Sequence, residues 1–448
     1  MTYIYPKATN GEMVALFLNF YFPKESIAFI DDSLQETSLE SLKNSIRQED
    51  RVFVCSTLHY EKLMNNLKQC GITNVFNGIV WCGEVLNAKL KYYKSKSNFK
   101  KYIGLVENGV DGKCFVDLDS RLKSMGFGVV YLCASLDIYK KYNVDNNVCF
   151  LAYHTILEQI EELDMILMTE GQPTHKNVIG IDVTHGFQGC LVYPYNGHTL
   201  ANKKHLFYTY STLDYIVAPA RKIHHAYENL FREMKVNPKI LDTGYLKLDA
   251  DVERYKNYVI SQKEKGIKEQ RDIVIFAFTF LYDINRLKAL MEQVFALGFR
   301  VFYQPHPIFS NCVMPKILES FGANEQFLYD WDKMEAFYHS VCLVTECSSV
   351  GYTYPLTTCK PSICLRDKNF SMTQQELIKE GGGDYYEEKL MYLCKEDKDL
   401  RKTLEEVKQT QANYQLRVQD YRTKECFNFG NAVKSLAKQI ESILGDEK

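Results

Sequence analysis

The 448-residue sequence lacks the patterns that mark secreted, disulfide-stabilised and membrane-spanning proteins. No basic stretch followed by a long apolar run stands near Met1, and the apolar residues 14–22 fall short of the roughly 20 that a membrane helix needs. The 14 cysteines form no Cys-x-x-Cys pair, which favours reduced, mostly buried thiols over disulfides or a zinc site. A net charge of -2 gives no overall attraction to nucleic acid. We therefore expect a cytoplasmic protein without a nucleic-acid partner.

The first 88 residues also lack the glycines of a phosphate-binding turn. Their short strand-like runs, such as 51–55, resemble the small nucleotide-binding-like domain at the front of some sugar-modifying enzymes. That domain uses a glycine-rich turn so that backbone N–H groups can approach a phosphate closely. Here Gly11 is the one glycine in the matching stretch, which also contains Pro6 and Lys7. We predict a degenerate module with a structural or docking role that has lost dinucleotide binding.

Through the rest of the chain, short apolar runs alternate with amphipathic stretches, as in βα units that build parallel sheets. Strands are expected at 102–106, 129–133, 148–152, 165–168, 178–181 and 215–217, and again at 272–278, 300–303, 341–345 and 362–365. Helical spacing follows over 397–411 and 431–444. This pattern predicts an α/β fold with two Rossmann-like lobes that face a cleft, behind the small N-terminal module.

The domain organisation follows from the same pattern. We predict the module over residues 1–88, a basic linker over 89–101, an N-terminal lobe over 102–262 and a C-terminal lobe over 263–448. The linker carries six lysines among aromatic residues: Lys89, Lys91, Lys94, Lys96, Lys100 and Lys101. A solvated linker is the simpler interpretation. The alternative is contact with the anionic inner face of the cell membrane, where each lysine contributes about 1 kcal/mol.

Candidate functional residues follow several predicted strands, because open α/β sheets bind ligands beyond the carboxyl ends of their strands. After the strand at 178–181, His185 stands in a loop beside Gly186. Histidine titrates near neutral pH and is the usual general base. A structural histidine that is satisfied by a backbone hydrogen bond fits the residues equally well, so both interpretations stay open.

Two further segments suit phosphate binding. His306 lies between prolines after the strand at 300–303, and a held imidazole can donate to a phosphate oxygen or stabilise a leaving group. After the strand at 341–345, Ser348 and Ser349 stand where a helix would begin. The first N–H groups of a helix and neighbouring hydroxyls together form an anion site. The alternatives are a rigid turn with an incidental histidine and an ordinary N-cap serine.

The segment 242–249 is expected at the end of the first lobe. Gly244 suits a turn at a hinge, and Lys247 can reach a phosphate from there. A plain loop explains the same residues.

In their order and spacing, these segments resemble the CDP-glycerol glycerophosphotransferase family, which comprises teichoic-acid-type polymerases of the glycosyltransferase-B (GT-B) fold. The family's His-Gly-Thr, Thr-Gly-Tyr-Pro-Arg-x-Asp, His-Pro and Asp-Tyr-Ser-Ser segments, and a later Lys-Pro, are similar to His185-Gly186, Thr243-Gly244-Tyr245 with Asp249, His306-Pro307, Glu346-Cys347-Ser348-Ser349 and Lys360-Pro361.

The resemblance implies a role for each matching residue. His185 would be the base that takes a proton from the acceptor hydroxyl. His306 and the two serines would bind the diphosphate of the donor. Glu346, Gly186 and Lys247 complete the expected nucleotide- and phosphate-binding set.

The sequence departs from the family pattern at four positions. Phe187 replaces the family's threonine, and Lys247 stands where arginine is usual. Glu346 replaces aspartate, and Thr353 stands where an acidic residue is frequent. These departures concern the identity of the donor more than the fold.

A second resemblance covers the His-Pro and Ser-Ser segments alone. Bacterial sialyltransferases, polysialyltransferases and Kdo transferases share them and use CMP-sugars, with an acidic-Gly motif whose carboxylate is the base. Thr169-Glu170-Gly171 is similar to that motif and follows the strand at 165–168. Glu170 is therefore a rival to His185, and a cytidine nucleotide donor is common to both resemblances.

We therefore predict a transferase of bacterial capsule or teichoic-acid-like polymer biosynthesis. It would move a polyol phosphate such as glycerol phosphate from a CDP-activated donor to a hydroxyl of a glycan, a lipid-linked glycan or a polyol. The alternatives are a CMP-sugar glycosyltransferase of the sialic acid or Kdo type and a non-catalytic scaffold in capsule assembly. No cofactor is expected, and no Asp-x-Asp motif is placed to hold a metal.

Overall fold

The computed structural model describes residues 1–108, 115–144, 147–187, 207–278, 283–306, 310–346, 348–365 and 387–445. Two compact units make up the chain. The first comprises residues 1–109, 122–168 and 172–181, and the second comprises 110–121, 169–171 and 182–448. The predicted domain boundaries at 88, 101 and 262 stay predictions.

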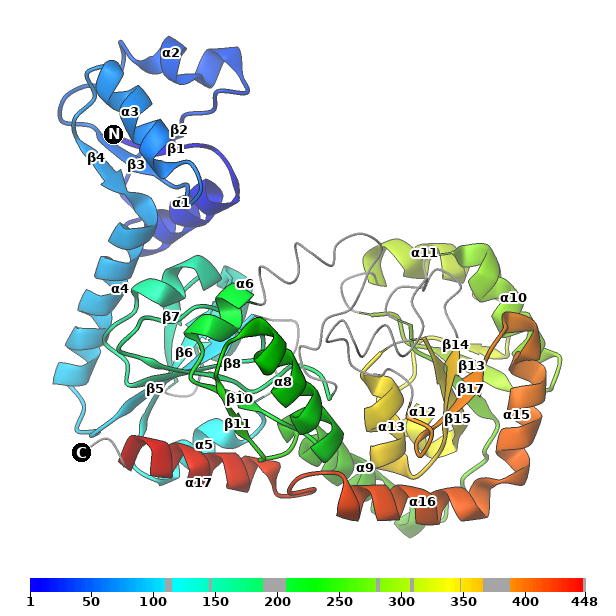
Figure 1. Cartoon of the computed structure of the whole chain (residues 1–448). Coiled ribbons are helices and arrows are strands. Elements are labelled where there is room, and N and C mark those ends of the chain that lie inside the picture. The colour runs from blue at the N-terminus through cyan, green and yellow to red at the C-terminus, as the bar shows by residue number, and fades with distance from the viewer. Residues whose placement is uncertain are drawn as a thin grey trace. The chain divides into compact units, whose positions relative to one another are not determined.

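The first unit begins with a parallel sheet in the order β2-β1-β3-β4, drawn in blue in Figure 1. The elements of this module are β1 (Thr2–Tyr5), α1 (Thr9–Tyr21), β2 (Ile27–Phe29), α2 (Leu39–Leu42), β3 (Arg51–Val54), α3 (Tyr60–Gln69) and β4 (Val75–Asn77). Tyr3, Tyr5, Val52 and Val54 lie in one buried cluster with Leu67 of α3. This sheet and its helices form the predicted small Rossmann-like module.

The turn after β1 closes on its own backbone. The N–H of Ala8 donates to the carbonyl oxygen of Pro6 over 3.0 Å, and the N–H of Lys7 donates to Ile30 over 3.0 Å. A Cβ added to Gly11 would lie 2.2 Å from the same carbonyl oxygen of Pro6. Two N–H groups of this turn are therefore used within the chain, and Gly11 is needed for close packing.

A cavity of about 620 Å³ opens at the carboxyl ends of β3 and β4. It lies between the start of α3 and the 3-10 helix η2 (His154–Gln159). Its lining mixes Lys62 with Glu61 and Glu158, so its charge selects no ligand of either sign.

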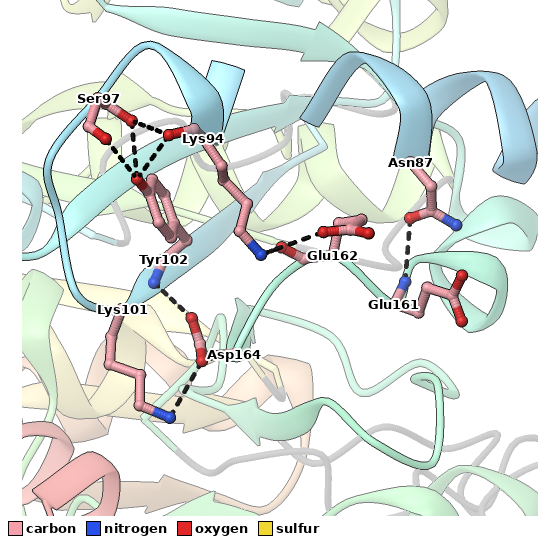
Figure 2. Close-up of polar contacts among 8 residues, drawn as sticks. All are labelled: Asn87, Lys94, Ser97, Lys101, Tyr102, Glu161, Glu162 and Asp164. Atoms are coloured by element: carbon pink, nitrogen blue, oxygen red, sulfur yellow. Dashed lines mark hydrogen bonds and ion pairs between the residues drawn. The ribbon is translucent and has the colours of Figure 1, made fainter. Parts of the chain in front are cut away.

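Helix α4 (Gly78–Ser95) runs from the module toward β5 (Tyr102–Glu107), so the predicted linker begins inside a helix. Figure 2 shows the polar contacts of two lysines of the predicted linker, Lys94 and Lys101. Lys94 Nζ donates to the carbonyl oxygen of Glu162 over 2.9 Å and lies 3.1 Å from its carboxylate. Lys101 pairs with Asp164 over 3.1 Å. Contact with a membrane stays a prediction, and these two lysines would have to leave their ion pairs to meet lipid.

The same contacts hold α4 against the segment that precedes β8 (Met165–Met168). The Asn87 side chain donates to the carbonyl oxygen of Gln159 over 2.8 Å. It also accepts from the N–H of Glu161 over 3.0 Å, as Figure 2 shows. Asp164 also accepts from the N–H of Tyr102 over 2.7 Å. Polar contacts therefore hold α4 against the segment 159–162 of the same unit.

The first unit continues with strands that lie side by side in the order β9-β8-β5-β6-β7. The added elements are β6 (Gly128–Cys133), α6 (Leu136–Tyr142), β7 (Val148–Leu151) and β9 (Ile179–Asp182). Strands β5, β6, β7 and β8 pair in parallel. Their nearly continuous burial explains the uninterrupted apolar runs of the sequence.

The second unit contains a parallel sheet in the order β14-β13-β12-β15-β16-β17. Its strands are β12 (Ile273–Phe276), β13 (Arg300–Tyr303), β14 (Phe327–Leu328), β15 (Ser340–Thr345), β16 (Ser362–Leu365) and β17 (Met391–Cys394). Figure 1 shows helices on both sides of this sheet. One buried cluster joins it to α10 (Ile284–Phe295), α11 (Ser310–Phe321) and α15 (Leu400–Gln409), and another joins it to α9 (Leu246–Glu264), α12 (Lys333–His339) and α13 (Val350–Thr358).

The remaining elements of the second unit precede and follow this sheet. Strands β10 (Tyr215–Val217) and β11 (Lys239–Leu241) pair in parallel around α8 (Arg221–Met234). The chain ends with α16 (Gln411–Lys424) and α17 (Ala432–Gly445), drawn in orange to red in Figure 1. Among the described residues, no helix combines the length and apolar character that crossing a membrane requires.

Gly83 offers a direct test of the contact between α4 and η2. A Cβ at Gly83 would lie 2.3 Å from Cβ of Gln159, so Gly83→Ala should push the two helices apart. We expect urea unfolding to show that the free energy of unfolding falls by about 1–3 kcal/mol, which is the usual cost of overpacking.

The sign of this effect decides the test. Alanine in place of a helical glycine otherwise stabilises a protein by up to about 1 kcal/mol. Gly445→Ala is the matched control, because a Cβ there meets no described atom within 4 Å. A stabilising Gly83→Ala would show that the two helices do not pack closely.

Candidate functional site

The sheet of the second unit reverses its strand order beside β12. The chain places β13 and β14 on one side of β12 and then β15, β16 and β17 on the other. In open α/β sheets, ligands bind beyond the carboxyl ends of the strands at such a reversal. Ser348 and Ser349 follow β15, and His306 follows β13. The topology therefore brings these candidate residues to the same edge of one parallel sheet.

Ser349 occupies the N-cap position of α13, but its side chain does not cap that helix. Its Oγ instead accepts a hydrogen bond of 2.6 Å from the backbone N–H of Phe187. The interpretation as an ordinary N-cap serine is therefore wrong for Ser349. Its hydroxyl can still donate its own proton to a ligand, and it stands at the start of a nine-residue helix.

The loop that carries His185 thus meets the start of α13. A Cβ added to Gly186 would lie 3.3 Å from Ser349 Oγ, which is tighter than ordinary contact. The Phe187 ring is buried and stacks on Tyr352 of α13, with ring centroids 5.5 Å apart. Ser349 therefore lies beside the His185-Gly186 loop in this structure, although it is far from that loop in the sequence.

The backbone around His185 is held in an unusual conformation. Thr184 has a φ of 57°, in the left-handed region that β-branched residues rarely adopt. Its hydroxyl donates to the carbonyl oxygen of Gly186 over 2.5 Å. The hydroxyl of Tyr245 donates to the carbonyl oxygen of His185 over 2.5 Å. Backbone strain of this kind is characteristic of functional sites.

Glu170 lies beside His185, so the two rival bases occupy one place. Its Oε1 is 3.8 Å from His185 Nδ1, and the two side chains are 44% and 40% exposed. The fully buried Asp182 ties their loops together. Its two oxygens accept from the N–H of Gly171 over 3.1 Å and from the N–H of Thr184 over 2.7 Å.

Asp182, Tyr245 and Tyr352 support the site and were not among the predicted site residues. Asp182 is the last residue of β9, three residues before His185. Tyr245 belongs to the Thr-Gly-Tyr segment. An aspartate that follows three apolar strand residues is the signal that could have identified the first. Stacking between Tyr352 and Phe187 leaves no such signal in the sequence.

The other predicted residues lie at or near strand ends. His306 is half-buried three residues beyond β13, and Glu346 is buried directly after β15. Lys247 lies in the first turn of α9. Burial lowers the pKa of Lys333, and the nearby charge of Lys247 lowers it further. Pro307 and Cys347, which belong to the predicted segments, lie outside the described residues.

Lys360 of the predicted Lys-Pro segment has a structural contact. Its Nζ donates to the carbonyl oxygens of Phe337 and Tyr338, each over 2.7 Å, and pairs with Glu269 over 2.7 Å. Burial lowers its pKa to about 8. This lysine therefore binds the carboxyl end of α12, where orphan carbonyl groups need donors.

Asp249 also has a structural contact. Its carboxylate accepts from the N–H of Gly430 over 2.8 Å and of Ala432 over 2.6 Å, at the start of α17. Burial raises its pKa to about 6, although these backbone N–H groups oppose the rise. Asp249 therefore joins α9 to the C-terminal helix.

No family model and no curated protein matches the sequence. Among solved structures, the wall teichoic acid polymerase TagF is similar with a TM-score of 0.53 and 17% identity, over 88% of this chain and 99% of the TagF chain. A TagF variant soaked with CDPG gives a TM-score of 0.54 at 17% identity, over 83% and 99%. Sucrose-phosphate synthase from Thermosynechococcus elongatus has a TM-score of 0.48 and 10% identity, over 77% of this chain and 100% of its own. The TagF likeness shows the fold: two Rossmann-like lobes of the GT-B type, as predicted.

The raised pKa of Asp249 predicts a pH dependence of stability. Between about pH 4 and pH 6 the carboxyl group is protonated in the folded chain and ionised in the unfolded chain, so stability falls as pH rises through this window. Asp249→Asn should remove this pH-dependent part of the free energy of unfolding. We expect it to be about 1 kcal/mol, because solvent screens a carboxyl group that is partly exposed. Urea unfolding across the window measures it.

Asp420→Asn is the control for this experiment, because its carboxylate is 49% exposed on α16. It should leave the slope of stability against pH as in the wild type. Equal slopes for Asp249→Asn and the wild type would contradict the prediction.

Proposed function

We propose that this protein is a transferase of bacterial surface-polymer biosynthesis that moves a polyol phosphate, such as glycerol phosphate, from a CDP-activated donor to an acceptor hydroxyl. The observation that carries the proposal is the hydrogen bond from Phe187 N–H to Ser349 Oγ. It joins the loop that bears a candidate base to a helix start suited to phosphate. A base beside an anion site is what transfer of a phosphoryl group to a hydroxyl requires.

In the proposed reaction, His185 takes the proton from a hydroxyl of a glycan, a lipid-linked glycan or a polyol. The acceptor oxygen then forms a bond to the polyol-bearing phosphorus atom. The bond from that phosphorus to the bridging oxygen of the diphosphate breaks, and CMP leaves with the electron pair. A positioned base of this kind contributes about 10²- to 10⁴-fold to the rate.

The donor diphosphate would lie along the carboxyl edge of the second sheet. Ser348, Ser349 and the first N–H groups of α13 would bind its oxygens, and His306 would approach from the end of β13. Gly186 leaves room beside Ser349, and Lys247 and Glu346 complete the proposed nucleotide-binding set. A structure of a TagF variant was obtained after soaking with CDPG, and a donor of that kind fits this proposal.

A CMP-sugar glycosyltransferase is the second candidate, and the position of Glu170 favours it. This carboxylate follows β8 and lies 3.8 Å from the His185 ring, where an acceptor hydroxyl would meet both groups. In that reaction Glu170 would take the acceptor's proton and the acceptor oxygen would form a bond to the anomeric carbon. The bond from that carbon to the phosphate oxygen would break, and CMP would leave with the electron pair. The two candidates share a cytidine nucleotide and differ in which side chain takes the proton.

Nucleotide binding and turnover test the proposal separately. We expect CMP and CDP at 100 times their dissociation constants to stabilise the full chain by about 2.7 kcal/mol, while ADP, GDP and UDP do not. Turnover of CDP-glycerol should fall about 10²- to 10⁴-fold in His185→Ala. The melting shift with CDP should persist in His185→Ala but weaken in Ser349→Ala.

Three outcomes would contradict the proposal. A response to UDP or GDP in place of cytidine nucleotides would favour a different nucleotide donor. Turnover of a CMP-sugar that tolerates His185→Ala but not Glu170→Gln would favour the second candidate. No response to any nucleotide would favour a non-catalytic scaffold in capsule assembly.

A further inference from the structure

We infer that Glu170 is a positioning residue that acts through His185, and that the two form one acid–base unit rather than two alternative bases. This inference rests on the proposed function and deepens it. It assigns to Glu170 the orientation of the imidazole and the stabilisation of the imidazolium that forms when His185 takes the acceptor's proton.

The geometry around the His185 ring carries the inference. Nδ1 is buried and has no hydrogen-bond partner within the described residues, and its charged neighbour is Glu170 Oε1 at 3.8 Å. The His185 side chain is nevertheless 40% exposed, so its exposure comes from other atoms of the ring. One ring nitrogen therefore faces the carboxylate, and Nε2 is the nitrogen that a substrate can meet.

The two loops are fixed relative to each other, so this pairing is more than two surface side chains that happen to meet. Asp182 binds the N–H groups of both loops, at Gly171 and Thr184. A Cβ at Gly171 would lie 2.6 Å from Thr209 Cγ2, which explains why glycine follows Glu170. The buried carboxylate of Asp182 therefore holds the backbone next to each functional side chain, after Glu170 and before His185.

The chemistry follows from this arrangement. When Nδ1 carries the proton and faces a carboxylate, the lone pair of the neutral imidazole lies on Nε2 and can accept the acceptor's proton. The resulting imidazolium is stabilised by the negative charge beside it. A separation of 3.8 Å is longer than a hydrogen bond, and catalytic hydrogen bonds often tighten only in the substrate complex.

A double-mutant cycle on CDP-glycerol turnover distinguishes one unit from two bases. His185→Ala should lower kcat about 10²- to 10⁴-fold, and Glu170→Gln should lower it less, by about 10- to 100-fold, with KM little changed. The double variant should be no slower than His185→Ala, because a positioning group has nothing to act on once the imidazole is absent.

Two kinetic outcomes would overturn the inference. In one, the losses multiply in the double variant, which means that the two groups act independently. In the other, Glu170→Gln abolishes turnover while His185→Ala is tolerated, which makes Glu170 the base itself. Glu228→Gln is the matched control, because Glu228 pairs with the exposed His225 over 2.9 Å on α8 and lies outside the proposed site. It should leave kcat unchanged.

A second measurement tests the pairing without turnover. ¹⁵N NMR of the full chain with labelled histidine reports which ring nitrogen carries the proton, and the His185 signals are assigned by their loss in His185→Ala. At a pH where the imidazole is neutral, we expect the Nδ1–H tautomer in the wild type and a shift toward Nε2–H in Glu170→Ala. An unchanged tautomer in Glu170→Ala would overturn the inference, even if the proposed reaction were wrong. A changed tautomer without turnover of any CDP donor would retain the pairing and reject the proposed function.

Discussion

The buried carboxylate of Asp182 is the constraint on which the candidate site depends. An ionised carboxylate is costly to bury unless hydrogen-bond donors surround it, and here the donors are backbone N–H groups from two different loops. The loop after β8 and the loop after β9 are thereby joined at a fixed distance. Glu170 is next to one of these donors and His185 is next to the other, so their approach follows from the backbone rather than from their own weak attraction. Exposed ion pairs contribute little by themselves, about 0–1 kcal/mol.

The strained backbone at Thr184 has the same origin. A positive φ at a β-branched residue costs on the order of 1–3 kcal/mol and persists only where the surroundings enforce it. Its N–H is bound by Asp182 and its hydroxyl by the carbonyl oxygen of Gly186. Three residues beyond Thr184, the N–H of Phe187 donates to Ser349 at the start of α13. A buried carboxylate, a strained residue and a helix start therefore together position the His185 loop.

Much of the fold could be predicted from the sequence, because runs such as 102–106 and 341–345 are apolar throughout and short, as strands of a doubly covered parallel sheet must be. The candidate residues could also be predicted, because most of them follow a predicted strand and the carboxyl ends of parallel strands lie at the same edge of a sheet. Other contacts could not be predicted, because one sequence pattern fits two structural states. Lysines within 89–101 resemble a solvated linker, yet α4 extends to Ser95, and Lys94 meets an acidic partner that is distant in the sequence. Lys360 and Asp249 match functional motifs, but their contacts are with helix ends, which only the three-dimensional structure reveals.

Phe187 contributes to the candidate site through both its backbone and its side chain. Its backbone N–H donates to Ser349 Oγ. Its side chain stacks on Tyr352, and its ring centroid lies 6.1 Å from that of Tyr245. Aromatic pairs of this kind contribute about 0.5–1.5 kcal/mol beyond the area they bury. Tyr245 and Tyr352 begin or lie within the helices α9 and α13, so the aromatic contact fastens the histidine loop to both. Phe187 therefore reinforces the contact between the loop of the candidate base and the start of α13, on which the proposed reaction depends.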